Sequence, residues 1–390
     1  MKNKFHNLLL TSRQRWDNST CKFQSQMTFR LCTLFLKLGS HYNPLLTRDC
    51  STNKFQCTSF LKFESHNNRG IALITVILIV AILMAVVLEL NRSSRADIYD
   101  AANLSDGIKL TYIAKSGFYG AAALLTNSKN DGPTTLHDNW AQTETLSLQS
   151  KTLFTDGYFI VTVEDEAGKI PINYLVKSDG TYNPDIKEIL IRLLRQQEFG
   201  LDERKIDEIV DAIKDWIDVD DITSDYGAET SYYASLDPPY VAKNAPLDCI
   251  EELLMIKGIT KEIFYGTKEK PGLAAYITAD SDDEKININT APKMVLRALA
   301  DGISAELADK MDEYRRKESN INLLSDPQWY RQVPGMAGVN ISPNLIMINS
   351  KYFKIISVGS MKNMAQSLSG VIKRSGSEQK SFEIIKWRQD

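Results

Sequence analysis

The sequence predicts an α+β protein in which one long N-terminal helix packs on an antiparallel sheet and a large helical region interrupts that sheet. Three observations predict this fold class. An uncharged apolar run of 18 residues, from Ile71 to Leu88, continues into a pattern of helical period. Segments rich in β-forming residues follow that helix and recur at the C-terminus. The residues between them, 176–345, read as an all-α insertion of amphipathic helices.

The apolar run predicts a transmembrane helix over 71–90. Its 18 residues, IALITVILIVAILMAVVL, reach the length that crosses the hydrocarbon core, and Thr75 is the one polar residue among them. A secretory signal has a shorter apolar region followed by a cleavage site of small residues, and no such site follows here. The helical pattern extends to about Asn127, before turn-forming residues at 130–133. We therefore expect one helix with an apolar first half and an amphipathic second half.

Residues 1–70 differ from the rest of the chain and are predicted to be a leader. They hold 11 Lys and Arg, only 3 Asp and Glu, and four of the five cysteines. Arg69-Gly70, directly before the apolar run, resembles a prepilin-type (class III) signal. This resemblance implies that a membrane peptidase cuts between Gly70 and Ile71 and leaves the helix on the mature protein. Because the segment is long for such a leader, we expect translation to start nearer the span, with Leu61 as the alternative start.

Charge and residue counts argue against several function classes. Residues 71–390 hold 35 Lys and Arg against 46 Asp and Glu, a net charge of −11, which is the wrong sign for a nucleic-acid partner. His137 is the one histidine after residue 70, too few for a multi-histidine zinc site and a narrow basis for a serine-hydrolase triad. Cys249 is the one cysteine in this part, so the mature chain cannot form an internal disulfide.

The predicted core after the span has two parts, 91–175 and 346–390. In the first part, Tyr158–Glu164 is rich in β-forming residues, and a turn at 167–169 can lead to a second strand over Ile170–Leu175. The second part predicts three strands joined by short loops: Tyr352–Ser360, Ala365–Arg374 and Phe382–Trp387. We expect these strands to form one antiparallel sheet that packs on the amphipathic half of the first helix.

The inserted region, 176–345, predicts a series of helices with single apolar faces: Asp185–Phe199, Asp202–Ile217 with Asp202 as N-cap, Leu247–Lys257, Ala291–Ala300 and Ser304–Lys317. Short turns at 257–260 and 301–304 resemble helix-hairpin-helix or SAM-like units. DNA-binding hairpins of this type have a second glycine where Thr260 and Ser304 stand. With the acidic surroundings, this favours hairpins that serve packing and not DNA binding.

An acidic segment between two predicted helices, 215–229, is the strongest candidate for a binding site. Its carboxylates repel one another unless a cation or water screens them, and Ca²⁺ prefers six to eight oxygen ligands. Asp218, Asp220 and Glu229 occupy positions one, three and twelve in an EF-hand count, although Ile222 stands at position five, where a ligand is needed. The alternative is a solvated acidic loop. A second acidic run, 280–284, is expected to be solvated.

Three segments together resemble the type II secretion system minor pseudopilin K family (general secretion pathway protein K). They are RGIALITV at 69–76, the block from Asp215-Trp216-Ile217-Asp218 to Tyr233, and ININTAP at 286–292, in which Thr290 can cap the next helix. The resemblance covers 69–390. It implies a pilin-like core with a helical insertion, and a metal site for calcium. The residues and the resemblance agree on the same candidate ligands: Asp218, Asp220, Asp225 and Glu229.

The family resemblance also implies a place and partners. The chain would cross the inner membrane once, with its C-terminal domain in the periplasm, after processing by prepilin peptidase and methylation. It would sit at the tip of the pseudopilus with minor pseudopilins I and J and other pseudopilins, and it would not be an enzyme. Related subunits carry Glu at the fifth mature position, where this chain has Thr75. A subunit without a neighbour above it needs no such carboxylate, which is costly in lipid; random drift of a membrane residue is the alternative.

Two rival functions remain open on the sequence. One is a minor pilin of a type IV pilus, which binding to a type IV major pilin would support. The other is a membrane-anchored enzyme, which turnover dependent on Asp218 or Glu229 would support. A glycosidase-type carboxylate pair is disfavoured, because the sequence marks neither an apolar pocket nor a sugar-binding cleft.

Overall fold

The computed structural model describes residues 69–127, 132–375 and 381–389. Contacts divide the chain into two units, Met1–Ile82 and Leu83–Asp390. The predicted leader up to residue 68, with the alternative start at Leu61, lies outside the described residues.

The first described helix, α2, runs from Arg69 to Asn127 as a single element of 59 residues. It contains an 18-residue window with a mean hydropathy of 3.4, and none of that window is buried, so the helix is long and apolar enough to cross a membrane. From Leu110 onward the helix buries one face, which includes Phe118 and Leu125. The prediction of one long helix to about Asn127, apolar first and amphipathic later, is therefore confirmed.

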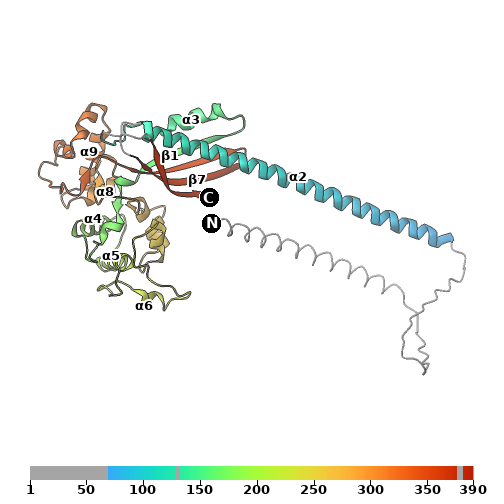
Figure 1. Cartoon of the computed structure of the whole chain (residues 1–390), viewed down its shortest axis with the longest axis horizontal. Coiled ribbons are helices and arrows are strands. Elements are labelled where there is room, and N and C mark those ends of the chain that lie inside the picture. Colours follow the sequence, from blue (N-terminus) through green and yellow to red (C-terminus); the bar gives the residue numbers. More distant parts are fainter. Residues whose placement is uncertain (1–68, 128–131, 376–380, 390) are drawn as a thin grey trace, which may run out of the picture. The chain divides into compact units, whose positions relative to one another are not determined.

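A four-stranded antiparallel sheet packs on the later part of α2, and Figure 1 shows β1 and β7 beside that part of the helix. The strands follow the order β1-β6-β7-β8. β1 is Tyr158–Asp165, β6 is Tyr352–Met361, β7 is Met364–Arg374 and β8 is Phe382–Gln389. β1 pairs with β6 from Tyr158 opposite Ser360 to Asp165 opposite Phe353. Strands from both ends of this unit thus form one sheet, and the predicted C-terminal strands are present.

The core between α2 and the sheet is closed by aromatic side chains and by two glycines. Trp140 and Phe353 pack edge to face with ring centroids 5.2 Å apart. A Cβ atom on Gly117 of α2 would lie 2.3 Å from the Ser357 hydroxyl, and one on Gly359 of β6 would lie 2.7 Å from the Leu110 carbonyl oxygen. Glycine is therefore required at both positions for the helix to approach the sheet this closely.

Helix α3, Thr143–Leu153, protects the outer edge of β1. The Ser150 hydroxyl accepts a hydrogen bond from the Phe159 amide at 3.1 Å and donates to the Phe159 carbonyl at 3.0 Å. The Ser147 hydroxyl accepts from the Val161 amide at 3.0 Å. These side chains occupy backbone groups that would otherwise be open to pairing with another strand.

A second core lies in the region between β1 and β6 and is built mainly from helices. The α-helices are α4 (Pro184–Leu194), α5 (Glu203–Ile217), α6 (Thr230–Tyr233), α7 (Lys261–Tyr265), α8 (Lys293–Ala298) and α9 (Ala305–Arg316). The predicted cap is present, because the Asp202 side chain accepts from the Lys205 amide, and Ser304 likewise caps α9 by accepting from the Leu307 amide. Gly258 has a φ of 87°, so its turn requires glycine before Thr260, which caps α7.

Short 3₁₀ helices connect these elements. They are η1 (Asn139–Ala141), η2 (Glu166–Gly168), η3 (Ile172–Leu175), η4 (Ile250–Met255), η5 (Leu273–Ala275), η6 (Glu318–Ser325) and η7 (Trp329–Gln332). The predicted helix over Leu247–Lys257 is thus the shorter 3₁₀ helix η4. Two two-residue strands also lie within 176–345, β3 (Ile277–Thr278) and β4 (Ile286–Asn287), and β4 pairs with β5 (Ile346–Met347), which follows directly. The expectation of a purely helical insertion was wrong in this detail.

The predicted second strand over Ile170–Leu175 was also wrong. Only β2, Ile170–Pro171, is a strand, and it pairs in parallel with β3 and not with β1. The following residues form η3. Ile170, Ile172 and Leu175 are completely buried in the second core. Apolar side chains can be buried from a strand or from a 3₁₀ helix. Here burial in the second core determined the conformation of the segment and outweighed its β propensity.

A buried group that we call the polar junction connects the end of β1 to this second region. It consists of Asp165, Asn287, Thr290 and Ser350. The Asp165 Oδ2 atom accepts from the Ser350 hydroxyl at 2.5 Å, the Thr290 hydroxyl at 2.6 Å and the Asn287 amide at 3.2 Å. Thr290 therefore does not cap the next helix as predicted; α8 begins after Pro292 without a side-chain cap.

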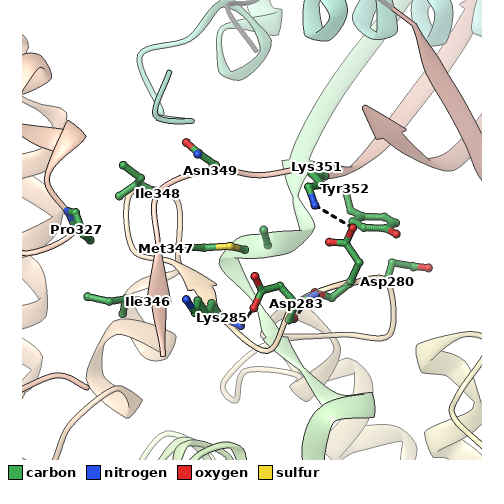
Figure 2. Close-up of a pocket in the computed structure, with 13 residues that line it drawn as sticks. Asp280, Asp283, Lys285, Pro327, Ile346, Met347, Ile348, Asn349, Lys351 and Tyr352 are labelled. Carbon is green, nitrogen blue, oxygen red and sulfur yellow. Dashed lines mark hydrogen bonds and ion pairs between the residues drawn. The ribbon is translucent and has the colours of Figure 1, made fainter. Parts of the chain in front are cut away.

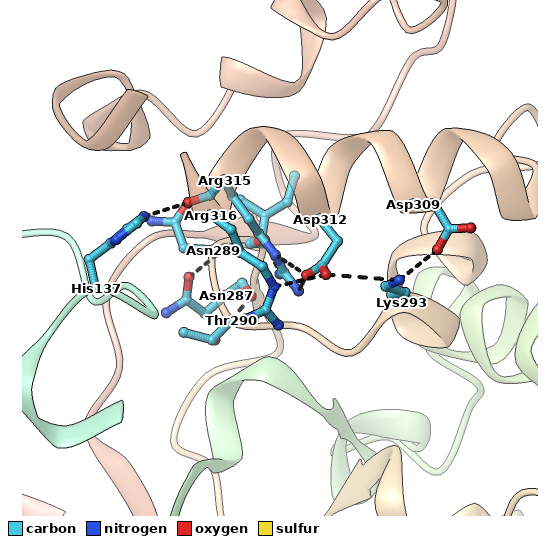
Figure 3. A network of polar contacts seen from close by, with 10 residues as sticks. His137, Asn287, Asn289, Thr290, Lys293, Asp309, Asp312, Arg315 and Arg316 are labelled. Atoms are coloured by element: carbon cyan, nitrogen blue, oxygen red, sulfur yellow. Dashed lines mark hydrogen bonds and ion pairs between the residues drawn. The ribbon is translucent and has the colours of Figure 1, made fainter. Parts of the chain in front are cut away.

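A buried ion pair within α9 lies beside the polar junction, and its arginine also connects the helix to neighbouring segments (Figure 3). The Arg315 guanidinium donates twice to one oxygen of Asp312, at 2.9 and 2.6 Å, and once to the Ile288 carbonyl at 3.1 Å. The Arg315 carbonyl contacts Nε2 of His137 at 2.8 Å. The one histidine of the mature region thus serves a contact between the segment after α2 and the end of α9.

Candidate metal centre

The candidate metal centre lies in the loop between α5 and α6. Helix α5 ends at Ile217 with Asp218 as its C-cap, and Glu229 is the N-cap position of α6. The ends of two helices therefore bring together residues that are eleven positions apart. Asp218, Asp220 and Glu229 each offer a carboxylate oxygen, and these oxygens lie within 4.8 Å of one another.

Two of the three carboxylates are buried and lack partners. Asp218 and Glu229 are 1% and 2% exposed, whereas Asp220 is exposed. Both oxygens of Glu229 and the Oδ1 atom of Asp218 have no hydrogen-bond partner among the described residues. An ionised carboxylate without a partner is expensive to bury, so this arrangement calls for a proton or a cation. The sequence left a solvated acidic loop as the alternative. That alternative does not apply to Asp218 and Glu229, because both are buried.

The fourth predicted ligand, Asp225, lies outside this group. It is exposed at a turn of the loop, and the three-residue group does not include it. The structure thus brings together three of the four predicted residues. The EF-hand count did not mark Asp225, which entered with the family resemblance.

Backbone hydrogen bonds to α5 shape the loop. Both oxygens of Asp215 accept from the Ser224 amide, at 3.2 and 3.0 Å, and Asp211 accepts from the Tyr226 amide at 3.1 Å. A Cβ atom on Gly227 would lie 2.0 Å from an oxygen of Asp215, so only glycine fits there. Asp215 of the acidic segment and Asp211, one turn earlier on α5, therefore build the loop.

Lys214 and Asn244 are further residues at the centre that the sequence analysis did not select. The Lys214 ammonium donates to Oδ2 of Asp218, four residues later on the same helix end. This i,i+4 spacing was a signal in the sequence. The Asn244 side chain donates to the Asp220 carbonyl at 2.9 Å, and its own Oδ1 atom is buried without a described partner. Nothing in the local sequence connected Asn244 to the loop.

Burial and mutual repulsion shift the acid–base properties of the centre. Burial, followed by repulsion from Asp215 and Asp218, raises the pKa of Glu229 to about 8. Burial also raises the pKa of Asp218, although the hydrogen bond from Lys214 opposes that shift. For Lys214, burial lowers the pKa, but the hydrogen bond and charge of Asp218 outweigh it and raise the pKa overall. Without a metal ion, Glu229 and Asp218 are therefore protonated more readily than ordinary carboxylates.

The second acidic run, 280–284, lines a different pocket of about 350 Å³ (Figure 2). Two of its acids, Asp280 and Asp282, form ion pairs with lysines of the C-terminal region. Asp282 lies 3.1 Å from the Lys351 ammonium and 3.4 Å from that of Lys373, and Asp280 pairs with Lys386. The expectation of a solvated run therefore holds for the exposed Glu284, whereas Asp280 and Asp282 are engaged in ion pairs.

Comparison with known proteins gives consistent matches to one family. Family models described as type II secretion system (T2SS), protein K, match residues 168–269 and 286–340, which include the candidate metal centre and part of the polar junction. A protein of *Escherichia coli* K12 that is a candidate type II secretion system protein K is 31% identical over 51% of this chain and 61% of its own length. Type II secretion system protein K of *Pseudomonas aeruginosa* PAO1 is 27% identical over 78% of this chain and 88% of its own length.

The fold also matches a solved structure. This is a chain in the crystal structure of the GspK-GspI-GspJ complex from the type 2 secretion system of enterotoxigenic *Escherichia coli*. The TM-score is 0.55 at 19% sequence identity, and the match covers 74% of this chain and 99% of that chain. The mixed helix and sheet architecture is therefore shared, while the identity is too low to transfer individual site residues.

Proposed function

We propose that the chain is a member of the type II secretion system protein K family, a minor pseudopilin, and that it is the tip subunit of a periplasmic pseudopilus. In this role it helps to initiate and cap assembly of the fibre that drives protein export across the outer membrane. The observation that carries the proposal is α2. Its first part is apolar and unburied, and its later part is the central helix of the folded unit that begins at Leu83.

The membrane arrangement follows from the same helix. We propose a single pass through the inner membrane, with the region after α2 in the periplasm, and cleavage between Gly70 and Ile71 by prepilin peptidase, followed by methylation. Gly70 and the residues after it are helical and exposed. We propose a structural and not an enzymatic role, because α2 serves to anchor the chain in the membrane and to assemble it into the fibre.

Thr75 supports a position at the end of the fibre. Its hydroxyl donates within its own helix, to the carbonyls of Ile71 at 3.1 Å and Ala72 at 2.9 Å. The side chain is thus satisfied in lipid without a neighbouring subunit. A glutamate at the same position would need a partner charge from a neighbour.

The region between β1 and β6 is proposed to be the helix-hairpin-helix or SAM-like insertion that covers the apex of the fibre. Its capped turns before α7 and α9 support this description. Its bulk on one pilin-like core would prevent a further subunit from stacking above it.

The partners are proposed to be minor pseudopilins I and J and other pseudopilins. We expect the full chain, extracted in detergent, to co-purify with its own I and J subunits and not with a type IV major pilin. The measurement is affinity purification from membranes that hold both systems. Preferential capture of the type IV pilin would contradict the proposal and favour the alternative, a minor pilin of a type IV pilus.

We further propose that Asp218, Asp220 and Glu229 hold a calcium ion. The described residues fit this ion, because three carboxylates converge and three of their buried oxygens have no other partner. Asn244 offers one more unpartnered oxygen close to the loop. A bound cation would neutralise the repulsion between these groups and fasten the end of α5 to the start of α6.

We expect Glu229→Gln to weaken calcium binding by at least about tenfold, because the affinity of such sites follows the number of charged ligands. Asp225→Asn removes the same charge from the exposed part of the loop and should change the affinity by less than about twofold. Calorimetric titration of the full chain in detergent with CaCl₂ measures both. Equal losses in the two variants would show that the three-residue group is not the binding site.

A further inference from the structure

Lys214 places a positive charge inside the candidate metal centre. Its side chain is only 14% exposed, and its ammonium contacts Oδ2 of Asp218 and lies 3.8 Å from Oδ1 of Asp215. The ammonium also lies 5.7 Å from the ring centroid of Tyr182, whose hydroxyl donates to Asp211. The lysine is therefore held between two carboxylates and an aromatic ring, and is not free to swing into solvent without losing these contacts.

The two carboxylate oxygens of Asp218 have different surroundings. Oδ2 accepts from Lys214, whereas Oδ1 is buried without a described partner and belongs to the same group as Glu229. Glu229, with both oxygens unpartnered and 2% exposure, is the independent sign that this group binds a cation. Lys214 can thus keep its contact with Oδ2 while a metal ion takes Oδ1.

We propose that Lys214 is a resident counter-cation of the metal centre, which stabilises the empty site and weakens the binding of a divalent cation. The inference rests on the proposed calcium site and describes how that site is regulated. Without metal, the lysine is the nearest positive charge to the buried carboxylates of Asp215 and Asp218. When a metal ion binds Oδ1 of Asp218, the Lys214 ammonium on Oδ2 of the same carboxylate repels it.

Two opposing effects of the lysine on metal affinity must be compared. Its hydrogen bond orients Asp218, which favours binding, and loss of such a contact to a metal ligand costs about 10- to 100-fold in affinity in some sites. Here, however, Asp218 is buried at the end of α5, and its amide is bonded to the Lys214 carbonyl at 2.9 Å, so the backbone also positions it. A unit charge about 6 Å from a divalent ion changes the affinity by about tenfold even with the dielectric constant of water, and by more in a partly buried site. Repulsion therefore dominates.

The test compares Lys214→Met with Lys187→Met in the full chain in detergent. Lys187 is a matched control, because its ammonium lies 3.6 Å from the same Tyr182 ring and it has no ion pair with a carboxylate among the described residues. Both variants lose one unit of charge and keep an unbranched side chain. Two quantities are measured: the dissociation constant for CaCl₂ by calorimetric titration, and the thermal unfolding midpoint in EDTA.

We expect Lys214→Met to bind calcium about tenfold more tightly or better and to unfold at a lower temperature in EDTA, while Lys187→Met changes the affinity by less than about twofold. Lys214→Gln, which keeps a donor but not the charge, should bind more tightly as well. A Lys214→Met protein that folds only in the presence of calcium would also support the proposal. Unchanged or weaker binding in both Lys214 variants would overturn it.

The failure of the calcium site is distinguishable from the failure of this inference. If the wild-type chain binds no calcium, the calcium proposal fails, but the unfolding midpoint in EDTA still tests the lysine. A lower midpoint in Lys214→Met than in Lys187→Met then supports Lys214 as the counter-cation of the carboxylates. Equal midpoints overturn that role.

Discussion

Arg315→Ala is expected to lower the free energy of unfolding by about 3–5 kcal/mol, the range for removing one partner of a buried ion pair. Arg315 is 2% exposed, and its loss would leave the buried Asp312 with only the exposed Arg316 and Lys293 as cations and would remove the donor to the Ile288 carbonyl. Chemical unfolding of the full chain in detergent, followed by tryptophan fluorescence, measures the change.

Arg316→Ala is the matched control for that experiment. Arg316 donates to the other oxygen of Asp312 at 2.9 Å, but its side chain is 58% exposed (Figure 3). A pair of this kind contributes about 0–1 kcal/mol, because water screens it. If the two substitutions lowered the free energy of unfolding by similar amounts, burial of Arg315 would not increase its contribution to stability, and the prediction would be wrong.

The second large effect is a pH dependence that arises from Asp165 in the polar junction. Burial raises the pKa of this carboxyl from 3.8 to about 6, although hydrogen bonds from Ser350 and Thr290 oppose the shift. Since the folded pKa lies above the unfolded one, the group stabilises the fold fully below about pH 3.8. That contribution is lost as the pH rises through 6. The difference corresponds to about 3 kcal/mol.

Asp165→Asn should remove this dependence, because the amide does not ionise between pH 4 and 7. The measurement is the free energy of unfolding of wild type and variant across that range, compared as a difference at each pH. Asp179→Asn is the control, because the Thr181 hydroxyl lowers the pKa of this exposed aspartate, which gives the opposite sign. A difference between wild type and Asp165→Asn that stays constant with pH would refute the prediction.

Elements with a long or strongly periodic pattern could be predicted from the sequence. The 18-residue apolar run requires a helix in any environment without water, so α2 was predictable through Asn127. The segment Tyr352–Ser360 likewise predicted β6, and in the structure its side chains alternate between buried and less buried along all ten residues. The ends of α5 and α9 were predictable because Asp202 and Ser304 are local caps.

Short segments that are buried on every side could not be predicted in the same way. Ile170 to Leu175 carries β-forming residues, yet most of it is a 3₁₀ helix. Thr290 fits a cap by its place before Pro292, yet it donates to Asp165, 125 residues earlier in the chain. In both cases a partner distant in sequence decides the outcome, and no local pattern contains that partner.

The candidate metal centre shows the same division. Composition and spacing were enough to select the acidic segment and three residues that converge, Asp218, Asp220 and Glu229. Only the tertiary structure decided that Asp225 faces solvent, that Asp215 ties the loop to α5, and that Lys214 shares Asp218. Sequence determines which charges are near one another along the chain. Folding determines which of them lose their water, and this loss is what gives a buried carboxylate its need for a cation.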